Sequence, residues 1–266
     1  MRLPVVVYYI GFVLALVGLL MALSAAVSLA YEDGSADILF VGGLLVIGAG
    51  VFPMVFVPFP RKISPREAML IVAGAWTTSI IAGAAPFYLY GLPFTLINAL
   101  FESVSGFTTT GASILTDVEA LPKGLRFWRS MTHWIGGVGI IVFALAVLPM
   151  LGQVTHALFR HEYSGLTGPQ AAPRAKQIAR VILVIFVSLT LIQTVLLMTA
   201  GVNLYEASTT AFGTLATGGF SVRNLSIAGY NSLSVEMIVM SFMIISGMNY
   251  SFIFLLITAP RRKMPG

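Results

Sequence analysis

The feature that most constrains this chain is a series of long apolar stretches separated by short polar segments. About 20 consecutive apolar residues form a helix that can cross the hydrocarbon core of a bilayer. We expect six such transmembrane helices, at residues 4–29, 38–59, 68–90, 124–151, 178–200 and 232–258. Only 9% of the 266 residues are charged and 58% are hydrophobic, whereas soluble domains have about 25% charged residues. The sequence therefore predicts an all-α polytopic membrane protein.

The positions of the cationic residues predict how these helices are oriented. Cytoplasmic loops of membrane proteins carry an excess of Lys and Arg. With a cytoplasmic N-terminus, the inner side holds 11 of the 15 cations, namely Arg2, Arg61, Lys62, Arg66, Arg160, Arg174, Lys176, Arg180, Arg261, Arg262 and Lys263. The acids on the outer side are Glu32, Asp33, Asp37, Asp117, Glu119 and Glu206. We predict a multi-pass protein of the cell inner (plasma) membrane, in contact with the lipid bilayer. The cytoplasmic cations account for the net charge of +5, so no nucleic-acid partner is needed to explain it.

Two further segments, 94–113 and 204–221, are too short to span the membrane. Each has about a dozen mildly apolar residues, roughly half the length that a span needs, followed by small polar residues and glycine. In the predicted topology both lie on the outer side, between an outward and an inward helix. Such a half-span is a re-entrant loop, which is tolerated where it is buried in protein or lines water.

The two segments match one another at an offset of 108 residues. Thr109 falls on Thr217 and Gly111 on Gly219 in this alignment. Ala99 likewise falls on Ala207, Ser113 on Ser221, and Asn98 on Glu206, the last pair at the outer start of each short helix. The order of helix, half-helix, polar turn and helix occurs twice in succession. Internal repeats in a membrane chain favour a site at the interface between the repeats.

The chemistry of the two turns is that of a cation site. A half-helix that enters from outside directs its partly negative C-terminal end to the membrane centre. The turn after it can present backbone carbonyls and threonine hydroxyls, and a ring of carbonyls replaces the hydration shell of a monovalent cation. Glycine permits the extended or positive-φ backbone that such a close approach requires. The alternative is that both turns only link helices and satisfy their hydroxyls locally.

Three segments carry a resemblance to a known family. They are FESVSGFTTTGAS (101–113), FWRSMTHWIGGVGIIVFALAVLPML (127–151) and TAFGTLATGGFS (210–221). These segments resemble the Trk/Ktr/HKT superfamily of cation transporters, most closely its TrkH/TrkG branch. The resemblance implies a potassium uptake subunit with four helix–pore-loop–helix repeats after two extra helices. It also implies no enzymatic activity and no cofactor, with K⁺ as the transported ion.

On this chain the resemblance implies four parts: two N-terminal helices (1–62), a first repeat (63–151), a cytoplasmic linker (152–177) and a second repeat (178–266). The implied filter residues are Thr109, Thr110 and Gly111 in the first turn, with Thr217, Gly218 and Gly219 in the second. Glycine at 111 and 219 favours potassium, because family members with serine at the first such glycine tend toward sodium. The branch also implies a peripheral, cytoplasmic nucleotide-binding regulatory subunit as a partner.

Two repeats supply only two of the four quadrants that the family filter needs. Either the chain is the N-terminal half of a longer or split protein, or two copies pair to close a pore. We expect a truncated or fragmentary chain, which alone does not conduct, and we retain a homodimer as the second arrangement. The remaining alternatives are a non-conducting membrane scaffold and an intramembrane hydrolase that uses Ser113 or Ser221 with His133. A zinc hydrolase is disfavoured, because HEYSG (161–165) has glycine where the HExxH motif needs histidine.

For each of four polar residues in or near apolar stretches, two alternative roles are considered. Glu102 adds negative field near the filter, or it holds the loop against neighbouring helices. Arg223 tempers the approach of cations, or it extends to the headgroups. His133, among the glycines of "HWIGGVG", serves packing first and hinge movement second. Asn249 is a residue of the cavity below the filter or stabilises a kink.

Overall fold

The computed structural model describes residues 2–58, 63–147 and 171–248, and the all-α prediction is confirmed within these ranges. No β-strand occurs in this part of the chain. Its helices are α1 (Leu3–Tyr31), α2 (Ala36–Phe56), α3 (Pro65–Tyr90), α4 (Leu96–Phe107), α5 (Lys123–Val147), α6 (Ala171–Thr199), α7 (Leu204–Leu215), the short 3₁₀ helix η2 (Ser226–Tyr230) and α8 (Leu233–Gly247).

Four of the described helices contain a segment long and apolar enough to cross a membrane, namely Leu3–Tyr31, Ala36–Phe56, Arg66–Tyr90 and Arg180–Thr199. The other two predicted spans coincide with α5 and α8, and their predicted ends at 148–151 and 249–258 lie outside the described residues. Asn249 lies outside them as well. Helix α6 begins at Ala171, so the last seven residues of the predicted linker (171–177) are helical rather than loop.

Helix pairs come close where small residues meet. The first two helices form a hairpin whose connection contains Asp33 and Ser35. In it, a methyl group on Gly18 would lie 2.7 Å from the carbonyl oxygen of Gly43, and one on Gly43 would lie 2.8 Å from that of Gly18. Without a hydrophobic driving force between helices in lipid, such close backbone contact supplies the packing energy.

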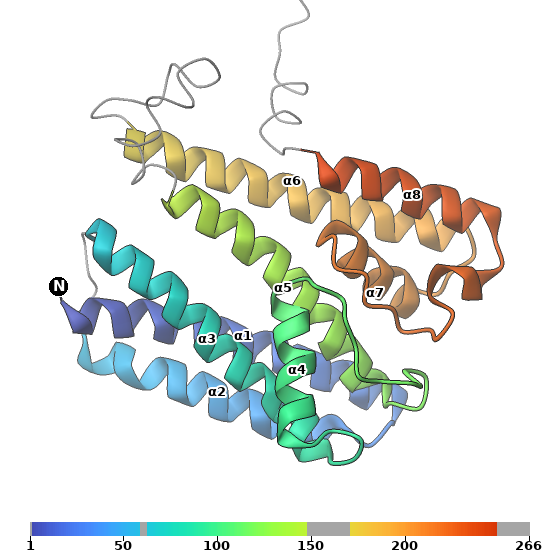
Figure 1. Cartoon of the computed structure of the whole chain (residues 1–266), viewed down its shortest axis with the longest axis horizontal. Helices are drawn as coiled ribbons and strands as arrows, with labels where there is room; N and C mark the ends of the chain where they lie inside the picture. Colours follow the sequence, from blue (N-terminus) through green and yellow to red (C-terminus); the bar gives the residue numbers. More distant parts are fainter. Residues whose placement is uncertain (1, 59–62, 148–170, 249–266) are drawn as a thin grey trace, which may run out of the picture.

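Helix α5 occupies the centre of the arrangement (Figure 1). It packs against α1, α3 and α4 on one side and against α6 and α7 on the other, and α4 also contacts α3. The largest apolar core surrounds its first turns, where Leu125 and Trp128 are fully buried together with Phe87 of α3. This central helix therefore borders both short helices, α4 and α7.

Polar contacts connect the N-terminal end of α5 to the hairpin of α1 and α2 and to α7. The Asp33 carboxylate accepts hydrogen bonds from the backbone N–H groups of Ser35 (3.0 Å) and Gly124 (2.6 Å). The hydroxyl of Tyr205 in α7 donates to the carbonyl of Lys123 at 3.0 Å. Although burial opposes ionisation of Asp33, the hydrogen bonds that its carboxylate accepts from Ser28, Ser35 and Gly124 outweigh it and hold the pKa of that carboxyl below its usual value.

Candidate functional site

Helices α4 and α7 are the same structural unit repeated at an interval of 108 residues. Each has 12 residues, and both their first and their last residues match at this offset. Each begins at a capping side chain: Thr95 Oγ1 accepts from the N–H of Asn98 at 3.3 Å, and Asn203 Oδ1 accepts from that of Glu206 at 2.9 Å. Asn98 and Glu206 therefore occupy the third position of the first helical turn, at the start of each short helix as the sequence predicted.

The turns after the two short helices follow the same backbone path. Thr109 and Thr217 have φ of 53° and 52°, and the glycines two residues later, Gly111 and Gly219, have φ of 78° and 96°. Matched backbone hydrogen bonds of 2.9 to 3.1 Å close the two turns. In the first turn the N–H groups of Thr109 and Thr110 donate to the carbonyls of Gly106 and Ser105. In the second turn the N–H groups of Thr217 and Gly218 donate to those of Thr214 and Gly213. A threonine with positive φ is uncommon, so its occurrence at both matched positions identifies a shared and specific conformation.

The two turns lie directly against each other. A methyl group on Gly111 would overlap the carbonyl oxygen of Gly218 and approach the Cα of Gly219 at 3.8 Å. None of the six predicted filter residues is buried, and Thr110, Thr217 and Gly219 are exposed. The second turn borders a cavity of about 470 Å³ that extends to α8. The structure thus brings the two predicted triplets, 109–111 and 217–219, to one place on the molecule.

Two adjacent glycines let α5 touch the ends of both short helices. A methyl group on Gly136 would overlap the carbonyl oxygen of Phe107, the last residue of α4. One on Gly137 would lie 3.0 Å from the Cα of Ala216, the residue after α7. These contacts explain why two glycines stand together in a helix, where each lowers intrinsic helix stability.

A buried ion pair supports the first turn. The fully buried Glu102 carboxylate accepts from Arg129 Nε at 2.5 Å, from Ser113 Oγ at 2.9 Å and from the N–H of Ile114 at 3.2 Å. Arg129, 3% exposed, also donates from Nη1 to the carbonyl of Ser221 at 3.0 Å. Glu102 is therefore a hydrogen-bonded support whose charge is matched by Arg129, and Arg129 links the chain beyond one turn to the chain beyond the other.

The sequence predicted no role for Arg129. A signal for one is present, because Arg129 lies about one and a half turns inside a helix predicted to be in the membrane. A charge at that depth requires a partner.

His133 is fully buried and stacks on the ring of Phe220. This is the packing role expected for it. Neither of its ring nitrogens has a hydrogen-bond partner of ordinary geometry among the described residues. A serine hydrolase needs its nucleophile within hydrogen-bond reach of the base. Ser113 instead donates to Glu102, so the described residues contain no such pair at His133.

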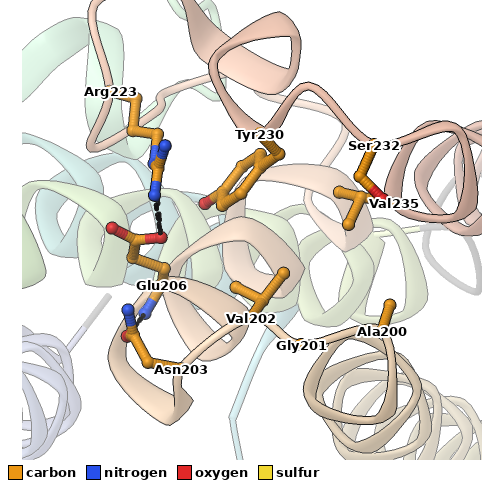
Figure 2. A pocket seen from close by; sticks show the side chains of 9 residues that line it. All are labelled: Ala200, Gly201, Val202, Asn203, Glu206, Arg223, Tyr230, Ser232 and Val235. Carbon is orange, nitrogen blue, oxygen red and sulfur yellow. Dashed lines mark hydrogen bonds and ion pairs between the residues drawn. The ribbon is translucent and has the colours of Figure 1, made fainter.

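Arg223 lines a small cavity of about 190 Å³ beside the start of α7, opposite Glu206 (Figure 2). Its Nη2 forms an ion pair with Glu206 Oε2 at 2.8 Å, and its Nη1 donates to the carbonyl of Gly229 at 2.6 Å. Its guanidinium also lies 4.3 Å from the ring centre of Tyr230. The hydrogen bond to Glu206 raises the pKa of Arg223 above its usual value. Neither of the two expected roles includes this ion pair, which fixes the side chain in place.

Hydrogen bonds of Asn224 connect the two loops that follow the turns. Its side-chain oxygen accepts from the N–H of Val118 (2.7 Å), its side-chain nitrogen donates to Asp117 (2.7 Å), and its own N–H donates to Glu119 (2.9 Å). The hydrogen bond from Asn224 lowers the pKa of the Asp117 carboxyl. This link between residues more than 100 positions apart carries no pattern that sequence analysis could find.

Comparison with known proteins gives one consistent result. The model of the TrkH family, described as a cation transport protein, matches residues 59–264. The Trk system potassium uptake protein TrkH of Escherichia coli K12 is 35% identical over 260 residues, which is 96% of this chain and 53% of that protein. The TrkG protein of the same strain is 31% identical over 258 residues, with the same coverage.

The crystal structure of the potassium transporter TrkH from Vibrio parahaemolyticus has a TM-score of 0.81 to this structure at 30% identity. The match covers 97% of this chain and 53% of that one. The chain thus spans about half the length of the relatives it matches.

Proposed function

Because the chain belongs to the TrkH family of cation transport proteins, we propose that it takes part in potassium uptake across the cell inner membrane. The observation that carries this proposal is the pair of adjacent turns at 109–111 and 217–219, which share one unusual backbone conformation. Each turn follows a short helix whose last carbonyls form a partly negative end. Two such ends together favour a cation over an anion.

In this proposal the two turns bind K⁺ through their backbone. Carbonyl oxygens of Thr109, Thr110 and Gly111 in one turn, and of Thr217, Gly218 and Gly219 in the other, replace part of the hydration shell of the ion. Because backbone atoms are the ligands, the side chains serve to hold the turns in place. The contacts of Glu102 and Arg129 to both segments supply such support.

Each turn contributes one quadrant of a filter, and this chain contributes two of four. Support for this division comes from two facts: the chain contains two copies of the unit, and it spans about half of its relatives. The proposed layout has six transmembrane helices (α1, α2, α3, α5, α6 and α8) with α4 and α7 as re-entrant half-helices. The remaining two quadrants come from further repeats or from a second copy in a homodimer.

The proposed topology places the N-terminus in the cytoplasm. The linked outer loops around Asp117 and Asn224 then lie outside, where the short helices also begin. The linker 152–177 lies on the cytoplasmic side, where a nucleotide-binding regulatory subunit of the Trk type is the proposed partner. A scaffold without transport activity would leave the matched left-handed turns without a purpose, so we do not favour it.

Growth of a potassium-uptake-deficient bacterium at low K⁺ tests this function. A chimera would join this chain to the part of Escherichia coli TrkH that the chain does not match, and the chain alone would be expressed in parallel. We expect the chimera to restore growth and Rb⁺ uptake, whereas the chain alone does not do so as a monomer. Gly34→Ala in the chimera is the control, since Gly34 has φ of 79° with no atom within 4 Å of an added methyl group. A chimera that reaches the membrane and gives no uptake above background would contradict the proposal.

A further inference from the structure

We infer that Phe220 is a positioning residue that fixes the second turn, and that Arg129 and His133 of α5 hold it. Phe220 directly follows the predicted filter triplet 217–219. The inference deepens the proposed function and rests on it for its consequence in transport. We call the contact of Arg129 and His133 with Phe220 the clamp. Its existence can be tested without any bound ion.

The ring of Phe220 lies between two side chains of the central helix. The imidazole of His133 stacks on it with ring centres 3.9 Å apart and 17° between the planes. The guanidinium carbon of Arg129 lies 3.4 Å from the same ring centre. Two groups at these distances would overlap if they shared one face, so they cover opposite faces of the ring. All three side chains are at most 3% exposed.

The clamp holds the chain on both sides of the second turn. Just beyond the ring, Arg129 donates to the carbonyl of Ser221 at 3.0 Å. Just before it, Gly218 packs so closely on His133 that a methyl group there would overlap the imidazole. A cation over an aromatic face contributes more when both are desolvated, as they are here. The Phe220 ring is therefore held by stacking on His133 and by the cation–π contact with Arg129.

The first turn has no equivalent of this device. The residue that matches Phe220 at the 108-residue offset is Ala112, which is exposed. Ser113, the next residue, is instead held by Glu102. Both devices converge on Arg129, which pairs with Glu102 and covers Phe220. A helix of the first repeat thus positions the turn of the second, which makes the two quadrants depend on each other.

Hydrogen exchange at matched backbone amides tests the clamp. The amides of Gly218 and Thr110 occupy the same place in their turns and donate at 3.0 and 2.9 Å to Gly213 and Ser105. The chain would be reconstituted in lipid bilayers and followed by NMR as wild type, Phe220→Ala and Phe220→Leu. We expect Phe220→Ala to speed exchange at Gly218 at least about tenfold relative to Thr110, with a smaller increase for Phe220→Leu, which keeps volume without a flat face.

Variants of His133 separate clamping from general packing. His133→Phe keeps a stacked ring and should leave the exchange of Gly218 near its wild-type rate, whereas His133→Ala should raise it. Phe212→Ala is the control, because it removes a ring of the same size from α7 that contacts Phe127 and Trp134. We expect it to leave the ratio of the two amide rates unchanged.

The outcomes of this experiment are distinct. If Gly218 and Thr110 change together in Phe220→Ala, or if His133→Ala equals wild type, the clamp is refuted. If Phe220→Ala does not fold, the comparison of His133→Ala with His133→Phe decides alone. A K⁺ titration of the wild-type spectra reports separately on function. Signals of 217–219 that ignore K⁺ would contradict the proposed ion site and leave the clamp intact.

Discussion

Gly111→Ala is the substitution with the sharpest expected effect on the proposed filter. Its added methyl group would overlap the carbonyl oxygen of Gly218, which must retreat by on the order of 1 Å to reach van der Waals contact. The positive φ of 78° costs about 1 to 3 kcal/mol in addition for a residue with a Cβ. Gly34→Ala carries the same backbone cost, since its φ is 79° and no atom lies within 4 Å.

The comparison of these two variants separates the effect of displacing the Gly218 carbonyl from the effect of backbone strain. Thermal unfolding in detergent should show a loss of stability for both, larger for Gly111→Ala because of the overlap. Ion flux in liposomes, measured on the chimera, should show K⁺ preference over Na⁺ reduced at least about tenfold, or about 1.4 kcal/mol, for Gly111→Ala alone. If Gly111→Ala retains the wild-type preference, or if Gly34→Ala loses it equally, the geometric reasoning is refuted.

Three further predictions concern residues away from the filter carbonyls. Glu102→Gln should destabilise the chain by about 3 to 5 kcal/mol, because it leaves the buried Arg129 guanidinium without its counter-ion. Glu206→Gln, in the partly exposed pair with Arg223, should cost about 0 to 1 kcal/mol. Equal losses of unfolding free energy in the two variants would disprove this. Gln193 is fully buried, and its side-chain amide has no hydrogen-bond partner among the described residues. Gln193→Leu should therefore leave the stability of the chain unchanged or raise it, because it removes a buried polar group without a partner. A clear drop in the unfolding temperature would contradict this. The pKa of Asp117 is lowered by Asn224, so this loop contact persists above the ordinary pKa of an aspartate and is lost as pH falls through the lower, folded value. The side-chain amide signal of Asn224 should titrate with a midpoint below the ordinary pKa of an aspartate carboxyl, and a midpoint at or above that ordinary pKa would contradict the contact.

The helical fold and the repeat could be predicted because both have a local signal. Apolar length alone located the four helices that are long and apolar enough to cross a membrane. The 108-residue offset followed from the identical residues Thr109 and Thr217, and Gly111 and Gly219, and the two short helices begin and end at this offset. Glycine is the residue type that a positive-φ turn favours, so the repeated Gly111 and Gly219 carry a local signal, whereas the positive φ of Thr109 and Thr217 has none.

The predicted span 178–200 agrees with the apolar segment Arg180–Thr199, but the helix that contains it begins seven residues before the predicted span. Cations such as Arg174 and Lys176 were assigned to a loop because they end the apolar stretch, whereas α6 begins at Ala171. Alanine, arginine, lysine and glutamine are all strong helix formers. A helix therefore continues past the residues that lipid can cover, and hydropathy does not locate its end.

The contacts that support the turns could not be predicted, because their partners are far apart in sequence. Arg129 meets Glu102 across 27 residues and Ser221 across 92. Only the close approach of α5 to both short helices, which Gly136 and Gly137 permit, brings these groups to one place.

Anomalous diffraction from crystals soaked in Tl⁺ tests the central proposal most directly, with the chain in its complete assembly. We predict ion peaks between the turns 109–111 and 217–219, within coordination distance of backbone carbonyls from both, which K⁺ displaces and Na⁺ does not. Peaks that occur only elsewhere, or turns whose carbonyls point away from any bound ion, would contradict the account.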